Sequence, residues 1–223
     1  MHTTRHVGEK IHKNYRGNKM SQGQRFVDKC LTTEVNLQPW PHQILHDTFD
    51  EQTFQKLNDV CLSKLSHIKT DKLIQIHPKD YKDYGIDFYD ETVDICEKLF
   101  ENIKDVHGVY PAYRKYPTLG MNAHINITPP LPYKFYIHQE GLEKTWSSVT
   151  YISPKQNVGT KMYTAQTEDA FEKEADWKPN STFIFCGQQN KTWHSYESNQ
   201  TTNRITFNLF IMKPRSDKCF YPL

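Results

Sequence analysis

The second half of the chain is divided into short runs in which apolar and polar residues alternate, and this pattern restricts the fold more than any other feature. Such alternation is typical of β-strands that bury one face. Proline, glycine and asparagine separate the runs, as in residues 129–132. Many short strands with such breaks favour a β-sandwich or jelly roll. We expect strands over residues 121–127, 133–138, 147–152, 162–163, 181–185 and 204–212.

The first half is expected to be rich in α-helix. Asp50 can cap a helix over residues 51–65, and residues 91–106 carry apolar side chains at helical spacing. Residues 79–90 are predicted to form a loop, whose aromatic side chains would be either a lid over a binding site or an apolar anchor. The sequence therefore predicts a mainly β fold with flanking helices.

Residues 1–29 are polar and basic, and we expect them to form a flexible N-terminal arm. The remaining residues, 30–223, are long enough for one domain with a packed core. An aromatic content of 13% supports such a core. The net charge of +2 is too small to indicate nucleic-acid or membrane binding by itself. The arm gives weak support to a nucleic-acid contact, and a solvated tail is preferred.

Targeting and redox signals indicate a cytoplasmic protein. The five cysteines are scattered and include no CxxC pair, which favours reduced thiols. No apolar run is long enough for a transmembrane helix, and the N-terminus has no apolar stretch of the kind found in secretory signals.

Two histidines, a carboxylate and an arginine follow one another in the strand-rich half. If the strand continues through residue 140, His138 and Glu140 point to the same face. His194 would join them from a distant strand. Two imidazoles and one carboxylate leave positions open on a non-haem Fe(II) ion, two for a 2-oxo acid and one for O2. Arg204, with Thr206 on the same side of its strand, would pair with a carboxylate, because a buried arginine needs an anion.

Three polar residues alternate on the strand before this set, namely Asn122, His124 and Asn126. They share one face of that strand. Lining a pocket, where they would touch a co-substrate or a substrate, and forming a polar outer face of the sheet are equally favoured interpretations.

The chain resembles the Fe(II)/2-oxoglutarate-dependent dioxygenases, in particular the small single-domain, prolyl-hydroxylase-like type found in phages and marine bacteria. The resemblance covers roughly residues 39–212. Residues 39–44, Pro-Trp-Pro-His-Gln-Ile, look like the entry to the domain. Residues 138–163 look like the first metal-binding strand and its successors, and residues 177–206 like the distal half. The last two stretches are the specific ones.

The resemblance implies a double-stranded β-helix core over about residues 118–213, with Fe(II) as cofactor and 2-oxoglutarate and O2 as co-substrates. It implies that His138, Glu140 and His194 hold the metal. It also implies that the co-substrate binds to residues that we expect to be Arg204, Thr206, Asn122 and Tyr133. Most members of the family have aspartate where this chain has Glu140, whose side chain is one methylene longer.

The function implied is therefore that of an oxygenase, a hydroxylase that releases succinate and CO2. Fold and cofactor do not identify the substrate, although a protein or amino-acid side chain is slightly favoured. A non-catalytic jelly-roll module for binding or structure is the alternative. A cupin-like metal enzyme is a third interpretation, which would not need Arg204.

Overall fold

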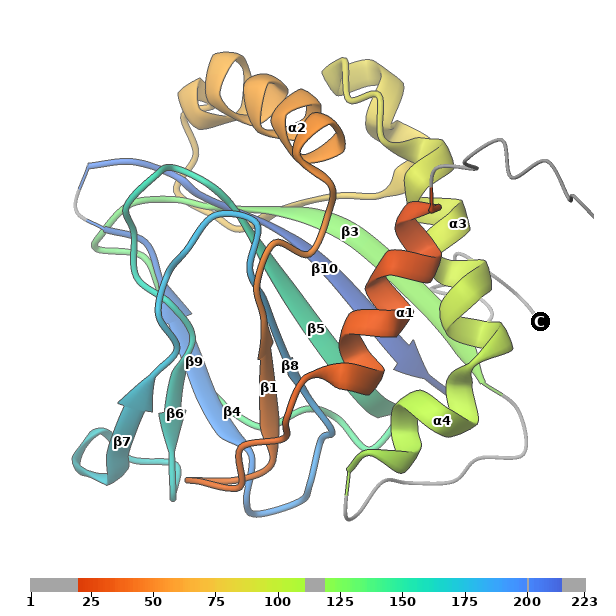
Figure 1. Cartoon of the computed structure of the whole chain (residues 1–223). Coiled ribbons are helices and arrows are strands. Elements are labelled where there is room, and N and C mark those ends of the chain that lie inside the picture. Colours follow the sequence, from red (N-terminus) through yellow and green to blue (C-terminus); the bar gives the residue numbers. More distant parts are fainter. Residues whose placement is uncertain (1–19, 111–118, 200, 214–223) are drawn as a thin grey trace, which may run out of the picture.

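The computed structural model describes residues 20–110, 119–199 and 201–213 (Figure 1). The helices are α1 Gln22–Thr32, α2 Glu51–Ser63, α3 Tyr89–Glu101 and α4 Ile103–Gly108, with 3-10 turns η1 Leu65–His67, η2 Pro78–Tyr84 and η3 Glu168–Ala170. The strands are β1 His42–Leu45, β2 Ile74–Ile76, β3 Gly120–Thr128, β4 Lys134–His138, β5 Lys144–Ser153, β6 Lys161–Tyr163, β7 Phe171–Glu174, β8 Thr182–Phe185, β9 Trp193–Glu197 and β10 Arg204–Met212.

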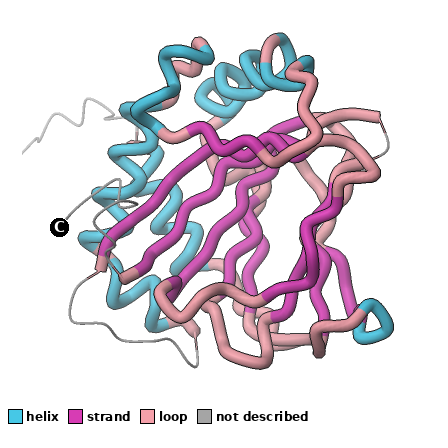
Figure 2. Tube along the Cα trace, turned by 180° about the vertical axis from the view of Figure 1, so that it is seen from behind, coloured by secondary structure: helices cyan, strands magenta, loops and turns pink. Residues whose placement is uncertain are grey.

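The strands form two antiparallel sheets. The six-stranded sheet has the order β1-β8-β5-β10-β3-β2, and the four-stranded sheet has the order β4-β9-β6-β7. Figure 2 shows the long central strands of the larger sheet from the face opposite the helices. The mainly β fold predicted from the alternating runs is thereby confirmed.

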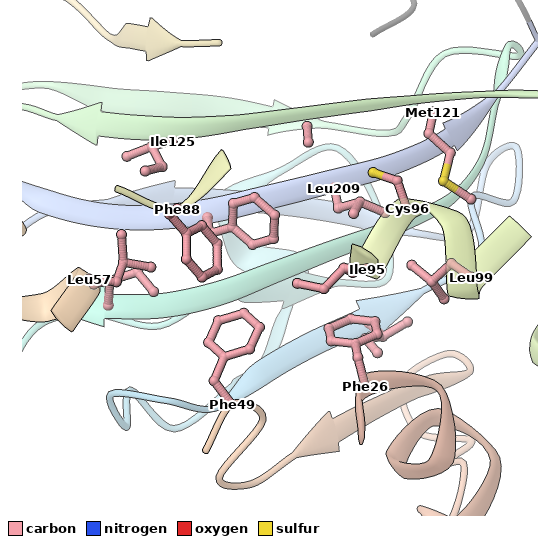
Figure 3. Close-up of a cluster of buried hydrophobic side chains, with 14 of the residues drawn as sticks. Phe26, Phe49, Leu57, Phe88, Ile95, Cys96, Leu99, Met121, Ile125 and Leu209 are labelled. Carbon is pink, nitrogen blue, oxygen red and sulfur yellow. The ribbon is translucent and has the colours of Figure 1, made fainter. Parts of the chain in front are cut away.

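Helices cover one face of the six-stranded sheet and enclose the main apolar core between themselves and its strands (Figures 1 and 3). Figure 3 shows Phe26, Phe49 and Phe88 packed together against the sheet. Phe49 and Phe88 meet edge to face at 5.4 Å between ring centroids. Burying aromatic side chains in this way contributes strongly to stability, because each removes a large apolar area from water.

Alternation along β10 assigns its two faces to different tasks. The odd-numbered residues from Ile205 to Ile211 belong to the core beneath the helices. Arg204, Asn208 and Phe210 point to the opposite side, into the space between the two sheets. Because successive side chains of a strand point to opposite faces, β10 has the apolar core on one face and the polar cavity on the other.

Helix α1 corrects the expected N-terminal arm. The Ser21 hydroxyl caps it by accepting from the backbone N–H of Gln24 at 3.2 Å. Phe26, Val27 and Cys30 lie on its inner face and are fully buried. The basic residues of this segment obscured an amphipathic helix whose spacing was readable. Residues 1–19 of the proposed arm lie outside the described residues.

The segment between β2 and α3 is an anchor and not a lid. Tyr81 and Phe88 are buried in the main core, at 1% exposure each. The part expected to be a loop forms the turn η2 and the start of α3. Within the described ranges, no helix is long and apolar enough to cross a membrane.

Candidate functional site

A cavity of 420 Å³ lies between the two sheets, and its walls come from both. It brings together residues from β3, β9 and β10 with the segment that follows β4. Most of the predicted site residues line this cavity, namely His138, Glu140, His194, Arg204 and Asn122. The fold therefore brings together predicted site residues that lie far apart in the sequence.

The two histidines face each other across neighbouring strands. His138 ends β4 and pairs with His194 of β9, with ring centroids 4.2 Å apart. Each ring places Nδ1 against a backbone carbonyl, that of Tyr136 at 3.0 Å and that of Thr192 at 2.9 Å. A carbonyl only accepts, so Nδ1 carries the proton and Nε2 keeps its lone pair, as a metal ligand requires.

Both imidazoles are uncharged at neutral pH. Burial lowers the pKa of His194 to about 3, and burial also lowers the pKa of His138. The 4.0 Å approach of His194 Nε2 to Glu140 Oε1 is therefore not an ion pair. Two neutral nitrogens are thus available in the cavity.

Glu140 does not continue the strand of His138, because β4 ends at His138. The expected sharing of one strand face is wrong, yet the carboxylate still enters the cavity from the following turn. Its Oε2 lies 2.7 Å from Lys144 Nζ, and its Oε1 accepts from Ser147 Oγ at 3.0 Å. Burial raises the pKa of Glu140, but the attraction and hydrogen bond of Lys144, together with the nearby His194 and His138, outweigh it, and the pKa falls to about 2.

Gly187 makes room for the glutamate. A Cβ atom at this position would lie 3.2 Å from Glu140 Cβ and 3.3 Å from the carbonyl oxygen of Lys144. A larger residue would crowd the base of the glutamate side chain.

The donor types fit an Fe(II) ion: two imidazole nitrogens with lone pairs and one ionised carboxylate. As they stand, however, these side chains are neighbours and not a finished ligand set. Within residues 20–110, 119–199 and 201–213, no three histidine, cysteine, aspartate or glutamate side chains are arranged to hold a metal. The carboxylate is engaged with Lys144 and Ser147 instead.

Arg204 is a buried cation that forms no salt bridge with a carboxylate of the described residues. It is 2% exposed, and its Nε donates to the carbonyl of Val158 at 3.1 Å. Its Nη2 is buried and makes no hydrogen bond within the described part of the chain. Three rings surround the guanidinium at 5.2–5.5 Å, those of Tyr151, Trp177 and Tyr196. Cation–π contacts hold the group in place and leave Nη2 without a hydrogen-bond partner among the described residues.

The remaining predicted residues separate into three cases. The buried hydroxyl of Thr206 donates to Asn208 Oδ1 at 2.7 Å, so Thr206 acts on the cavity through Asn208. Asn122, His124 and Asn126 all line the cavity, which decides between the two interpretations of that strand. Tyr133 precedes β4, is half-buried and is not among the residues that line the cavity.

Several residues of the site were not singled out by the sequence analysis, among them Asn208, Lys144, Ser147 and Gln75. Asn208 was readable, because it follows Arg204 on the same face of an alternating strand. Lys144 and Ser147 were not, since their role depends on how the turn after β4 returns to β5. Gln75 comes from the edge strand β2, and nothing in the sequence around it marks it as a residue of the site.

Comparisons of the sequence identify no family model that matches, and no curated protein matches either. Solved structures do match. A prolyl hydroxylase from Trichoplax adhaerens, in complex with a hypoxia inducible factor oxygen degradation domain peptide fragment, aligns with a TM-score of 0.54 at 11% identity, covering 85% of this chain and 88% of that chain.

Two further matches are similar in extent. The viral collagen prolyl hydroxylase from Paramecium Bursaria Chlorella virus-1, in its 2OG complex, has a TM-score of 0.51 at 9% identity, with 78% of this chain and 96% of that chain covered. A prolyl-4-hydroxylase from Pseudomonas putida has a TM-score of 0.50 at 12% identity, with 85% and 93% covered. At such identities the likeness concerns the fold.

Proposed function

We propose that the protein is an Fe(II)- and 2-oxoglutarate-dependent oxygenase that hydroxylates a protein or amino-acid side chain. In this proposal the two sheets are the halves of a double-stranded β-helix. One observation carries it: the unpaired Arg204 cation shares a cavity with two neutral imidazoles and an ionised carboxylate. The likeness in fold to prolyl hydroxylases supports the same assignment.

Arg204 would bind the far carboxylate of 2-oxoglutarate. Burying a cation without an anion costs several kcal/mol. A ligand with a carboxylate would supply the missing negative charge beside Arg204 and offset this cost. The guanidinium fork matches a carboxylate in bidentate fashion. Thr206 would assist only indirectly, because its hydroxyl is engaged in a hydrogen bond to Asn208 Oδ1.

His138, Glu140 and His194 would hold the iron. When bound, Fe(II) supplies the oxidation of a substrate C–H bond by O2 with conversion of 2-oxoglutarate to succinate and CO2. The protein's own groups orient the reactants and exclude water. The carbonyls of Tyr136 and Thr192 fix each imidazole in one tautomer, which keeps Nε2 directed to the metal side.

Lys144, Ser147 and Gly187 would allow glutamate to serve where aspartate is usual. Lys144 and Ser147 hold the carboxylate ionised and restrict its orientation, and Gly187 leaves space at its base. A longer and more flexible side chain needs such anchoring, because its rotamer freedom is otherwise lost on binding a metal.

Anaerobic titration tests the proposal. Fe(II) and 2-oxoglutarate added together to the purified protein should produce the weak visible charge-transfer band of a 2-oxo acid chelate. In Arg204→Leu the intensity of this band should no longer reach a plateau as the concentration of 2-oxoglutarate is raised. Lys155→Met, a change of an exposed cation, serves as the matched control and should behave like wild type.

Absence of the band from wild-type protein that stays folded would refute the oxygenase and favour the non-catalytic jelly-roll module. If the band appears, succinate formation that depends on both Fe(II) and 2-oxoglutarate, measured with a panel of peptides, would identify the substrate.

A further inference from the structure

The cavity has a second polar wall that neither the metal site nor Arg204 uses. It is formed by Gln75 of β2, Asn122, His124 and Asn126 of β3, and Asn208 of β10, and is called the amide wall here. All of these residues except Gln75 are at least nine-tenths buried. Burying so many amide groups is costly unless they find partners.

Hydrogen bonds orient the amide wall. Burial lowers the pKa of His124 to about 3, so its ring is neutral and has one N–H. Gln75 Nε2 lies 3.2 Å from His124 Nε2, and His124 Nδ1 lies 3.4 Å from Asn122 Oδ1. Because an amide nitrogen only donates, His124 accepts at Nε2 and donates from Nδ1. Asn122 therefore presents its N–H groups to the cavity.

The amide wall also contains an unsatisfied acceptor. Asn126 is 3% exposed, and its Oδ1 makes no hydrogen bond with any described residue. Asn208 has its Oδ1 occupied by Thr206 and so turns its NH2 group to other partners. The wall thus offers both donors and a free acceptor, which is the complement of an amide group.

Register places the wall beside the proposed metal site. Asn122 lies opposite Phe210, and the Nζ atom of Lys144 lies 3.9 Å from the centroid of the Phe210 ring. Arg204 lies opposite Thr128, about 20 Å of strand from Asn122, whereas Asn126 lies opposite Thr206, two residues along β10 from Arg204. The wall therefore extends from the proposed metal site toward Arg204. Gln75 is exposed on the edge strand, so the wall reaches the mouth of the cavity.

Charge excludes a free amino acid as the preferred ligand. An α-carboxylate would need a cation, yet Lys144 is paired with Glu140, and Arg204 is assigned to the co-substrate. The other charged residue that lines the cavity, Glu143, has the wrong sign for a carboxylate. The amide wall itself carries no formal charge.

Ring contacts disfavour a nucleobase, which usually stacks on an open aromatic face. Phe135 is stacked on Tyr196 at 4.7 Å and on Tyr136 at 4.8 Å. Phe210 lies between Lys144 and His124. The third phenylalanine of the cavity, Phe185, packs against the His194 ring at 4.8 Å.

We propose that the amide wall binds the substrate of the oxidation proposed above, and that it takes an uncharged amide group. The inference rests on the proposed function for the reaction, but the binding itself does not. The amide comes either from a peptide backbone or from a carboxamide side chain. The protein accordingly acts on an amino acid within a peptide, or on an amide-bearing molecule, in preference to a zwitterion.

Ligand-observed NMR titrations of the full chain test this inference without added metal, so that no probe binds by chelation. N-acetylglycine N-methylamide represents the backbone amide, propionamide the carboxamide, glycine the zwitterion and 1-methyluracil the nucleobase. We expect one of the two amide probes to bind more tightly than glycine and 1-methyluracil. The stronger of the two identifies the source of the amide.

Asn126→Leu removes the unsatisfied acceptor at nearly constant volume and should weaken the amide probe about tenfold. Asn122→Leu gives a second variant should the first not fold, as judged by circular dichroism. Gln55→Leu on the exposed surface of α2 is the matched control and should leave binding unchanged.

Tighter binding of glycine or of 1-methyluracil would overturn the inference, as would an unchanged amide affinity in both folded variants. Binding of 2-oxoglutarate with Fe(II) is measured separately. A protein that binds the co-substrate but no amide retains the proposed function and loses the amide wall as its substrate site.

Discussion

Glu140 and Arg204 are two buried charges in one cavity, and the protein treats them in opposite ways. Glu140 has a lysine at 2.7 Å and a serine hydroxyl at 3.0 Å. Arg204 has one backbone carbonyl, three aromatic rings and an Nη2 without a hydrogen bond in the described chain. The anion is satisfied internally, whereas the cation is only held in position.

This difference separates a charge that is paired within the protein from one that is not. A charge with its own counter-ion is stable without a partner from outside, and its loss leaves the counter-ion unpaired. A charge held by rings keeps its position but still lacks an anion. In the proposed function, Arg204 is therefore the group that would bind an anion, and Glu140 is a carboxylate that the protein already holds in place. Substitutions at the two residues and at their partners should produce opposite patterns of stability and binding.

Arg204→Leu should have the largest effect. Affinity for 2-oxoglutarate should fall by about 3 kcal/mol, roughly a hundredfold, because a buried charge-assisted pair is lost. The free energy of unfolding without ligand should stay within about 1 kcal/mol of wild type, since leucine removes an unpaired buried cation. Isothermal titration calorimetry and urea unfolding measure the two quantities. A strongly destabilised variant that still binds 2-oxoglutarate would contradict the comparison.

Lys144→Gln should show the reverse order of effects. It leaves the Glu140 carboxylate buried without a counter-ion, and the free energy of unfolding should fall by about 2–3 kcal/mol at pH 8. Lys144→Arg keeps the charge and should recover most of this loss. Urea unfolding of both variants provides the check. Equal stability of the glutamine and arginine variants would show that the ion pair does not stabilise the fold.

Acidification should reduce the penalty of Lys144→Gln. In wild type the pKa of Glu140 is held at about 2, below its ordinary value of 4.5, so this carboxylate contributes stability above pH 4.5 that is lost as the pH falls toward 2. Without Lys144, we expect the pKa of Glu140 to rise, because burial is the largest single effect on it and favours the protonated form. As the pH falls from 8 to 5, the unfolding free energy of the variant should therefore rise by about 1–2 kcal/mol relative to that of wild type. A pH-independent difference in unfolding free energy would rule this out.

Ser147→Ala should have the smallest effect of the series. It removes a neutral hydroxyl that donates to Glu140 Oε1, at a cost of about 1 kcal/mol in unfolding free energy. Lys144 remains, so the carboxylate stays ionised. Thermal unfolding at pH 8 measures the change. A loss as large as that of Lys144→Gln would mean that the hydroxyl, and not the lysine, holds the carboxylate.

Much of the site was readable because β-strands have a strict period. The alternation of residues 204–212 predicts which side chains share a face with Arg204, and the structure places Asn208 and Phe210 on that face. The same rule predicts that Asn122, His124 and Asn126 lie together. It fails at Glu140, because β4 ends one residue after Ile137 at His138, and a turn rather than a strand directs the carboxylate.

Helix α1 was missed for a different reason. Its basic residues suggested a solvated segment, but Phe26, Val27 and Cys30 recur at the spacing of one helical face. Charge on the outer face is compatible with full burial of the inner face. Composition was thus a poorer guide than periodicity.

The strand-rich second half, the faces of its strands and the residue types that suit a 2-oxo acid and a metal can be read from the sequence, because they depend on local periodicity and side-chain chemistry. Which charges are paired, in contrast, depends on the folded structure. Lys144 meets Glu140 through a turn, and Arg204 receives rings from three separate segments. Pairing depends on distances between segments far apart in the chain, and those distances exist only after the two sheets pack.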